Sequence, residues 1–96
     1  MDQNENIQLE NRRKRMIYRC EHRGMKEMDL LLGSYARAHI PQMDGGQLDA
    51  FEAFMSLQDQ DLYAWFIGSK PIPAEHNTPL FQQVLAFYRD QLNEKL

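Results

Sequence analysis

Apolar residues recur along most of the chain at the three- and four-residue intervals of amphipathic helices, and glycines and prolines interrupt them. The spacing predicts five helices, over about residues 7–21, 25–39, 47–57, 62–67 and 79–94. Loops are expected between them, the longest at residues 40–46 and 69–77. The polar residues 1–6 precede the first helix, and we expect them to be disordered.

The apolar positions of each long helix form a stripe that we expect to be buried. They are Leu9, Met16, Ile17 and Cys20 in the first helix, Met28, Leu30, Leu31, Leu32, Tyr35 and Ala36 in the second, Leu48, Phe51, Phe54 and Met55 in the third, and Phe81, Val84, Leu85, Tyr88 and Leu92 in the last. The short fourth helix carries Tyr63, Trp65 and Phe66. We expect these aromatic residues in the core, with one left over as a contact residue because so short a helix cannot bury all three.

Residues that favour helix ends lie where the apolar period starts and stops. Asp59 or Asp61 is expected to cap the fourth helix, and Gly68 is expected to end it. Thr78 followed by Pro79 predicts the start of the last helix, because threonine caps helices and proline suits the first helical position.

Strand-forming residues are scarce, since Val84 and Thr78 are the only valine and threonine in the chain. Helix-forming residues dominate instead. With 96 residues, the chain has the length of one domain. We therefore predict an all-α protein, a compact bundle of about five short helices in which residues 1–96 form a single domain.

Charge is unevenly distributed along the chain, although the net charge is only −3. Residues 1–26 carry seven Lys and Arg against four Asp and Glu, whereas residues 27–96 carry four against ten. A basic head on an acidic body indicates that one face meets something anionic. No apolar stretch approaches the roughly 20 residues of a membrane span, so we expect no direct membrane insertion.

The start of the chain lacks the apolar core of a secretory signal, and Asp2, Glu5 and Glu10 argue against a transit peptide. Cys20 is the only cysteine, so the fold does not depend on an internal disulfide. These features indicate a cytoplasmic protein.

Cys20 and His22 suggest a nucleophile and its base, but residues two apart on a helix point to different sides. A lone cysteine is more simply a small core residue. The three histidines, His22, His39 and His76, show no zinc-ligand spacing, and His39 suits a helix C-terminus. We predict neither a catalytic site nor a metal site.

The run Arg12-Arg13-Lys14-Arg15 suggests phosphate contacts, and Arg12, Arg15 and Arg19 share one side of the first helix. Short basic runs on helices are usually solvated faces, however. The run lacks the interleaved aromatic residues of single-strand binders, and no helix-turn-helix spacing is present. We therefore expect no nucleic-acid partner.

Arg23, Gly24 and Glu27 remain as candidates for a contact surface. Arginine offers a planar fork for carboxylate or phosphate, and glycine lets a partner approach the backbone closely. Glu27 lies in the first turn of the second helix, where it can pair with an arginine or offer an acceptor to a partner. Physical reasoning leaves an alternative open, a helix junction with a capping glutamate.

The stretch HRGMKEMDLLLGSYA around these residues resembles the Arg-Gly-x-x-Glu signature of the SdhE family of succinate dehydrogenase assembly factors. Downstream, DLYAWFIG is similar to the family's Asp-Leu-Tyr/Phe-x-Trp element. The resemblance covers roughly residues 12–90. Two departures stand out: many members have a second basic residue at the position of His22 and a proline at the position of Gln60.

The resemblance implies a bacterial five-helix protein, a monomer when free, that binds the flavoprotein subunit of succinate dehydrogenase and in some bacteria fumarate reductase. It implies that this factor promotes covalent attachment of FAD to a histidine of the subunit, that it is no enzyme, and that it holds no cofactor stably. By motif position, Arg23, Gly24 and Glu27 would lie in the interface near the flavin. Arg19 and His22 flank the motif in sequence and are added as candidates for the rim of the interface. Two alternatives stay open: an antitoxin-like or regulatory protein-binding module, and a nucleic-acid binder that uses the basic first helix.

Overall fold

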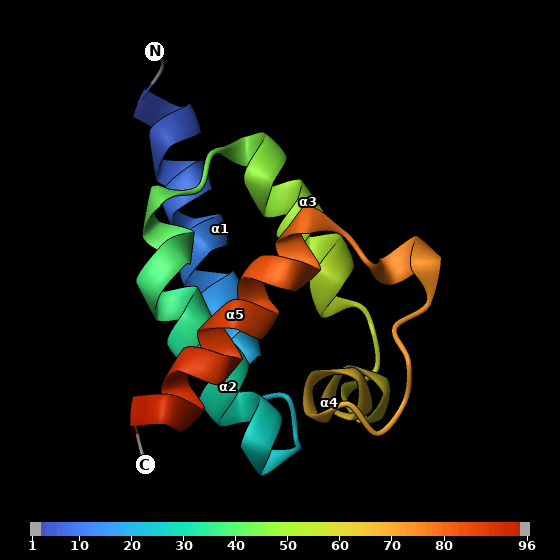
Figure 1. Ribbon diagram of the computed structural model, residues 1–96. Helices are drawn as coiled ribbons and strands as arrows, with labels where there is room; N and C mark the ends of the chain where they lie inside the picture. The colour runs from blue at the N-terminus through green and yellow to red at the C-terminus, as the bar shows by residue number, and fades with distance from the viewer. Residues whose placement is uncertain (1–2, 95–96) are drawn as a thin grey trace. The chain divides into compact units, whose positions relative to one another are not determined.

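The computed structural model describes residues 3–94, which form five α-helices and two short 3₁₀ helices (Figure 1). The elements are α1 (Gln3–Glu21), α2 (Lys26–His39), η1 (Ile40–Gln42), α3 (Gly45–Met55), α4 (Asp59–Ile67), η2 (Ala74–His76) and α5 (Pro79–Glu94). No strand occurs within this part of the chain. The all-α prediction is confirmed.

The described chain divides into two compact units, an N-terminal unit that ends at Ser56 and a C-terminal unit that begins at Leu57. The N-terminal unit contains α1, α2, η1 and α3, and the C-terminal unit contains α4, η2 and α5. The expectation of a single domain over residues 1–96 stays a prediction.

In the N-terminal unit, α1 and α2 run in opposite directions and pack closely (Figure 1). Gly33 makes the close approach possible, because a Cβ at this position would lie only 3.0 Å from Cγ of Glu21. An ion pair also links the two helices, with 3.3 Å between Nη1 of Arg37 on α2 and Oε2 of Glu21 on α1. The buried residues of this unit include Met16, Cys20, Met28, Leu32, Ala36, Ile40, Leu48 and Phe51.

Side-chain hydrogen bonds fix how the chain passes from α2 to α3. The guanidinium of Arg13, on α1, donates through Nε and Nη2 to the Met43 carbonyl oxygen, at 3.0 and 2.6 Å. Asp44 caps α3 in a capping box, in which its side chain accepts from the N–H of Gln47 and the Gln47 side chain accepts from the N–H of Asp44. Because of this cap, α3 begins at Gly45, two residues earlier than expected.

Aromatic side chains build the core of the C-terminal unit. Phe66 stacks on Phe81 with ring centroids 5.1 Å apart, and on Tyr88 with centroids 6.0 Å apart. Trp65 is 9% exposed; its indole stacks on the His76 ring at 5.4 Å and meets the edge of Phe81. Trp65 and Phe66 are thus core residues, as expected.

Two of the three helix ends predicted in the C-terminal unit are confirmed. Gly68 follows α4 in the left-handed conformation, with φ of +81°. The hydroxyl of Thr78 accepts a hydrogen bond from the backbone N–H of Phe81 at 3.1 Å, and Pro79 is the first residue of α5.

The prediction of an aspartate cap on α4 is wrong. Gln58 occupies the cap position without a side-chain hydrogen bond, and Asp59 and Asp61 lie inside the first turn. Carboxylates there still interact favourably with the unsatisfied N–H groups of the helix N-terminus. The residues act on the same end of the helix, but through its dipole rather than as a cap.

Two residues expected in buried stripes are exposed, Leu30 by 56% and Leu92 by 46%. At about 100° per residue, Leu30 lies on the side of α2 opposite the buried face around Met28 and Tyr35. Leu92 keeps the spacing of its stripe but lies one turn beyond Tyr88, near the end of α5.

The first helix begins four residues earlier than its apolar pattern predicts. Residues 3–6 are helical rather than disordered, because polar residues continue an α-helix that apolar residues further along anchor. Residues 1 and 2 lie outside the described part. Between residues 3 and 94, none of the helices combines the length and apolar character required to cross a bilayer.

Replacing Trp65 by alanine tests the aromatic core of the C-terminal unit. We expect Trp65→Ala to lower the free energy of unfolding by about 3–5 kcal/mol, because it removes a buried indole and leaves a cavity. Tyr18→Ala is the control, since Tyr18 is an aromatic residue that is 63% exposed and should change the free energy by less than about 1 kcal/mol. Denaturant unfolding followed by far-UV circular dichroism measures both. Equal losses for the two variants would contradict the assignment.

Candidate functional site

The turn between α1 and α2, residues 22–25, carries the Arg-Gly pair. Gly24 has φ of +104°, in the left-handed region that favours glycine. A Cβ at Gly24 would meet no atom within 4 Å, so a side chain would strain the backbone without a clash. The carboxylate of Asp29 accepts hydrogen bonds from the N–H groups of Arg23 and Gly24, the second at 3.2 Å from N to Oδ1. The first turn of α2 therefore holds the chain reversal that precedes it.

The Arg23 side chain connects this turn to α3. Its Nη1 donates to the carbonyl oxygen of Met55 at 2.7 Å, and Met55 is the last residue of α3. Carbonyl groups at a helix C-terminus lack an intrahelical donor and carry partial negative charge, so a guanidinium is a favourable partner. Arg23 is half-buried as a result. Its first role is structural, and the helix-junction interpretation is correct for this part of the motif.

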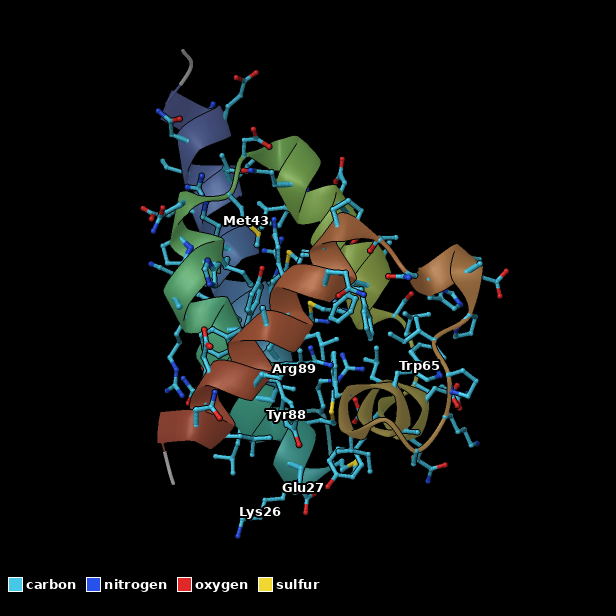
Figure 2. All side chains as sticks on the ribbon, viewed as in Figure 1. Lys26, Glu27, Met43, Trp65, Tyr88 and Arg89 are labelled. Carbon is cyan, nitrogen blue, oxygen red and sulfur yellow. The ribbon has the colours of Figure 1, made fainter. Side chains whose placement is uncertain are left out.

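Glu27 differs from the other two residues of the motif. It is exposed in the first turn of α2, and within residues 3–94 its carboxylate makes no hydrogen bond or ion pair. Figure 2 shows Glu27 and its neighbour Lys26 at the start of α2, with side chains directed away from the ribbon. An exposed carboxylate can accept hydrogen bonds from a partner. Its position in the first turn of a helix is also favourable, because negative charge there interacts well with the helix dipole.

The two residues expected at the rim, Arg19 near the end of α1 and His22 in the turn that follows, both have intramolecular contacts. Arg19 is exposed and forms an ion pair with Glu52, with 3.4 Å between Nη1 and Oε2. The His22 ring stacks on the Tyr18 ring with centroids 4.0 Å apart, and Nδ1 of His22 lies 2.8 Å from the Tyr18 carbonyl oxygen. Since that oxygen can only accept, Nδ1 carries the proton. These contacts involve residues of α1 and α3 outside the Arg-Gly-x-x-Glu motif.

The basic run of α1 is used largely within the N-terminal unit. Arg12 pairs with Asp49, with 2.6 Å between Nη2 and Oδ1, and Arg13 binds the Met43 carbonyl as described above. Lys14 and Arg15 are exposed and have no hydrogen bond or ion pair in the described chain. Of the three arginines spaced along one side of α1, Arg12 and Arg19 thus pair with carboxylates of α3, whereas Arg15 does not.

Cys20 is completely buried, and its Sγ lies 3.5 Å from Sδ of Met55. Burial raises the pKa of the Cys20 thiol to about 12, against a smaller opposing effect of the nearby Arg23 and Arg19 charges. The His22 ring is occupied on the Tyr18 carbonyl and gives the thiol no base. The expected assignment of Cys20 to the core is correct.

The other two histidines lie against aromatic rings. His39 packs on Tyr35 in the N-terminal unit, and His76 packs on Trp65 in the C-terminal unit. Across residues 3–94, no group of three or more His, Cys, Asp or Glu side chains has an arrangement that could hold a metal ion.

Asp29 is a residue of the site that the sequence patterns do not reveal. An aspartate in the first turn of a helix is usually explained by the helix dipole alone. The sequence feature that points to this role of Asp29 is Gly24, five residues earlier, because a turn with positive φ exposes N–H groups that need acceptors.

A family model described as "Flavinator of succinate dehydrogenase" matches residues 14–88 of the chain. The "FAD assembly factor SdhE" of Acetobacter pasteurianus is 32% identical over 77 residues, which are 80% of this chain and 71% of that protein. The "Succinate dehydrogenase assembly factor 2, mitochondrial" of Dictyostelium discoideum is 33% identical over 81 residues, 84% of this chain. The protein of the same description from Aedes aegypti is 32% identical over 91 residues, 93% of this chain.

The chain spans little more than half the length of the two mitochondrial relatives, 57% of the Dictyostelium discoideum protein and 53% of the Aedes aegypti protein. The region matched by the family model includes α2, α3, α4 and all three residues of the Arg-Gly-x-x-Glu motif.

The buried thiol gives a chemical test. With a pKa of about 12, Cys20 holds a thiolate fraction on the order of 10⁻⁴ at pH 8, so the folded protein should react only slowly with Ellman's reagent. Unfolding in guanidinium chloride should release one fast-reacting thiol. Because folding favours the protonated thiol, its contribution to stability is complete below about pH 9 and is lost as the pH rises toward 12.

Cys20→Ala serves as the blank for this measurement and should keep any activity of the protein. Rapid stoichiometric labelling of the folded chain at pH 8 would show that the thiol is accessible and would return Cys20 to the list of reactive groups.

Proposed function

The chain belongs to the family described as the flavinator of succinate dehydrogenase, and from this premise we propose that it binds the flavoprotein subunit of that enzyme and promotes covalent attachment of FAD to it. The family comprises succinate dehydrogenase assembly factors. Beyond this family membership, we propose which subunit the chain binds and which of its surfaces makes the contact.

The observation that carries the proposal is the presentation of the motif. The family match includes Arg23, Gly24 and Glu27, and these residues share one turn and the first helical turn after it. The Glu27 carboxylate makes no hydrogen bond or ion pair in the described chain, and the space where a Cβ of Gly24 would lie is open to beyond 4 Å. A charged group without a partner beside an accessible backbone is suited to docking another protein.

The three residues would act differently in this contact. Arg23 fixes the turn to the end of α3 through the Met55 carbonyl and thereby sets where the turn lies in the unit. Gly24 lets the partner's backbone approach. Glu27 would supply the charged acceptor, and an arginine of the partner is the donor that best matches a carboxylate.

The chemistry of flavin attachment is assigned to the partner and its flavin, and the chain is proposed to be no enzyme. Cys20, the only thiol, is buried and protonated, and His22 is engaged with a backbone carbonyl. The contribution of the chain is then binding energy. By binding one conformation of the flavoprotein, it would hold the acceptor histidine and the flavin in reactive geometry. Such positioning can lower the activation free energy by several kcal/mol.

In-gel flavin fluorescence tests the proposed function directly. The purified flavoprotein subunit is incubated with FAD, with and without the chain, then denatured and separated, so that only covalent flavin remains. We expect the chain to increase covalent flavin and to co-purify with the subunit. If neither the rate nor the yield changes, and no complex forms, the proposal is wrong.

Glu27→Gln tests the contact residue. Because Glu27 is exposed and unpaired in the described chain, the substitution should change the free energy of unfolding by less than about 1 kcal/mol. It should weaken binding of the flavoprotein about tenfold or more and slow flavinylation accordingly. Glu10→Gln is the matched control, since Glu10 is also exposed and unpaired on a helix of the same unit. Equal affinity of both variants and the wild type would exclude Glu27 from the interface.

Gly24 allows steric and conformational effects to be separated. Gly24→Ala and Gly24→Arg both force a side chain into positive φ, so both should lower stability by about 1–2 kcal/mol. Neither side chain meets a clash in the free chain at its Cβ. Only arginine adds bulk above the turn, and we expect it to abolish binding of the flavoprotein while alanine weakens it modestly. Isothermal titration calorimetry and thermal unfolding measure the two effects, and equal binding by both variants would show that no partner lies close to Gly24.

A further inference from the structure

The Asp29 side chain holds the backbone of the Gly24 turn. Its Oδ1 accepts from two successive N–H groups, those of Arg23 and Gly24. These groups lie between the end of α1 at Glu21 and the start of α2 at Lys26, outside the regular hydrogen bonding of either helix. Asp29 is half-buried, and its backbone N–H in turn donates to the Met25 carbonyl at 2.8 Å, which fixes the residue in the first turn of α2.

The acceptor matters most for the N–H of Arg23, because Arg23 is half-buried, whereas Gly24 is exposed. Glycine itself has no intrinsic preference that would select φ of +104° over its other conformations. A single carboxylate oxygen shared by both groups is satisfied only when the two N–H vectors converge. Convergence defines one conformation of the turn, so the carboxylate selects it from the many that glycine permits.

Glu27 and Asp29 lie in the same helical turn but have opposite surroundings. Residues two apart on a helix point to different sides, and the structure directs Asp29 to the turn while Glu27 stays in water. The turn that Asp29 holds also sets the start of α2 and the reach of Arg23 to Met55. The orientation of all three motif residues thus depends on one further carboxylate.

From this geometry we infer that Asp29 is a positioning residue for partner binding: it holds the Gly24 turn in the conformation that presents Glu27 and directs Arg23 to the end of α3. The inference rests on the proposed function, since it concerns the same contact with the flavoprotein. It assigns Asp29 no contact with the partner or with FAD.

Two substitutions separate the hydrogen bonds from the charge. Asp29→Ala removes the acceptor, whereas Asp29→Asn keeps one carbonyl oxygen in the same place and removes the charge. Asp49→Ala is the matched control: it also removes one aspartate from a helix of the N-terminal unit, but one that forms an exposed ion pair with Arg12. All variants are compared in the full chain, at a temperature at which circular dichroism shows each one fully folded.

Hydrogen exchange of the amides reports on the turn itself and needs no partner. We expect the Arg23 and Gly24 amides to exchange at least about tenfold faster in Asp29→Ala than in the wild type. In Asp29→Asn and Asp49→Ala they should remain protected to within about threefold. Unchanged protection of both amides in Asp29→Ala would overturn the inference before any binding is measured.

Binding of the purified flavoprotein subunit reports on the consequence. Asp29→Ala should bind at least about tenfold more weakly, and Asp29→Asn should recover affinity to within about threefold of the wild type. Retained affinity in Asp29→Ala, or an equal loss in both variants, would overturn the positioning role. If the wild-type chain itself fails to bind, the proposed function has failed, and the exchange experiment still decides whether Asp29 holds the turn.

A double-mutant cycle with Glu27→Gln distinguishes positioning from a general loss of structure. If Asp29 acts by presenting Glu27, Asp29→Ala should weaken binding much less in the Glu27→Gln background than in the wild type. The logarithm of the fold-change in Kd should be less than about half as large in that background. If the two losses multiply in full, Asp29 acts independently of Glu27, and the inference is wrong.

Discussion

The left-handed backbone of Gly24 is the constraint on which the N-terminal unit depends. The chain reverses within residues 22–25, and this reversal lets α1 and α2 pack so closely that Gly33 lies against Glu21. Two hydrogen bonds to Asp29 hold the reversal from one side. From the other side, the Arg23 guanidinium holds it to the last carbonyl of α3. A glycine is required because any other residue would be strained in this conformation, although there is space for a side chain.

The same contacts change how the charge of the sequence is interpreted. A basic head and an acidic body suggest an external anionic partner, but Arg12 and Arg19 pair with carboxylates of α3, and Arg13 binds the Met43 carbonyl. Exposed ion pairs of this kind contribute little to stability individually. Their effect is to balance part of the basic charge of α1 within the unit. The Glu27 carboxylate, by contrast, makes no ion pair within the described chain.

The chemical groups of the chain fit a protein that acts by binding. A nucleophilic thiol must be deprotonated and accessible, and Cys20 is neither, because it lies in an apolar environment that raises its pKa to about 12. The aromatic cluster of the C-terminal unit places Trp65 between His76 and Phe81, where it serves as core. Membership of a family of assembly factors agrees with the proposal that the chain acts by binding and that the Gly24 turn is its contact surface.

The sequence by itself determined the helices, because the apolar period, the left-handed Gly68 and the Thr78 cap are local features that act within a few residues. It also indicated Arg23, Gly24 and Glu27 as a set through their resemblance to a family. Only the tertiary structure decided what each side chain does. Arg23 finds its acceptor 32 residues away, and a helical period cannot tell which of two acids, Glu27 or Asp29, faces the turn. The physical reason is that periodicity assigns residues to the faces of one helix, whereas hydrogen-bond partners depend on which elements the folded chain brings together.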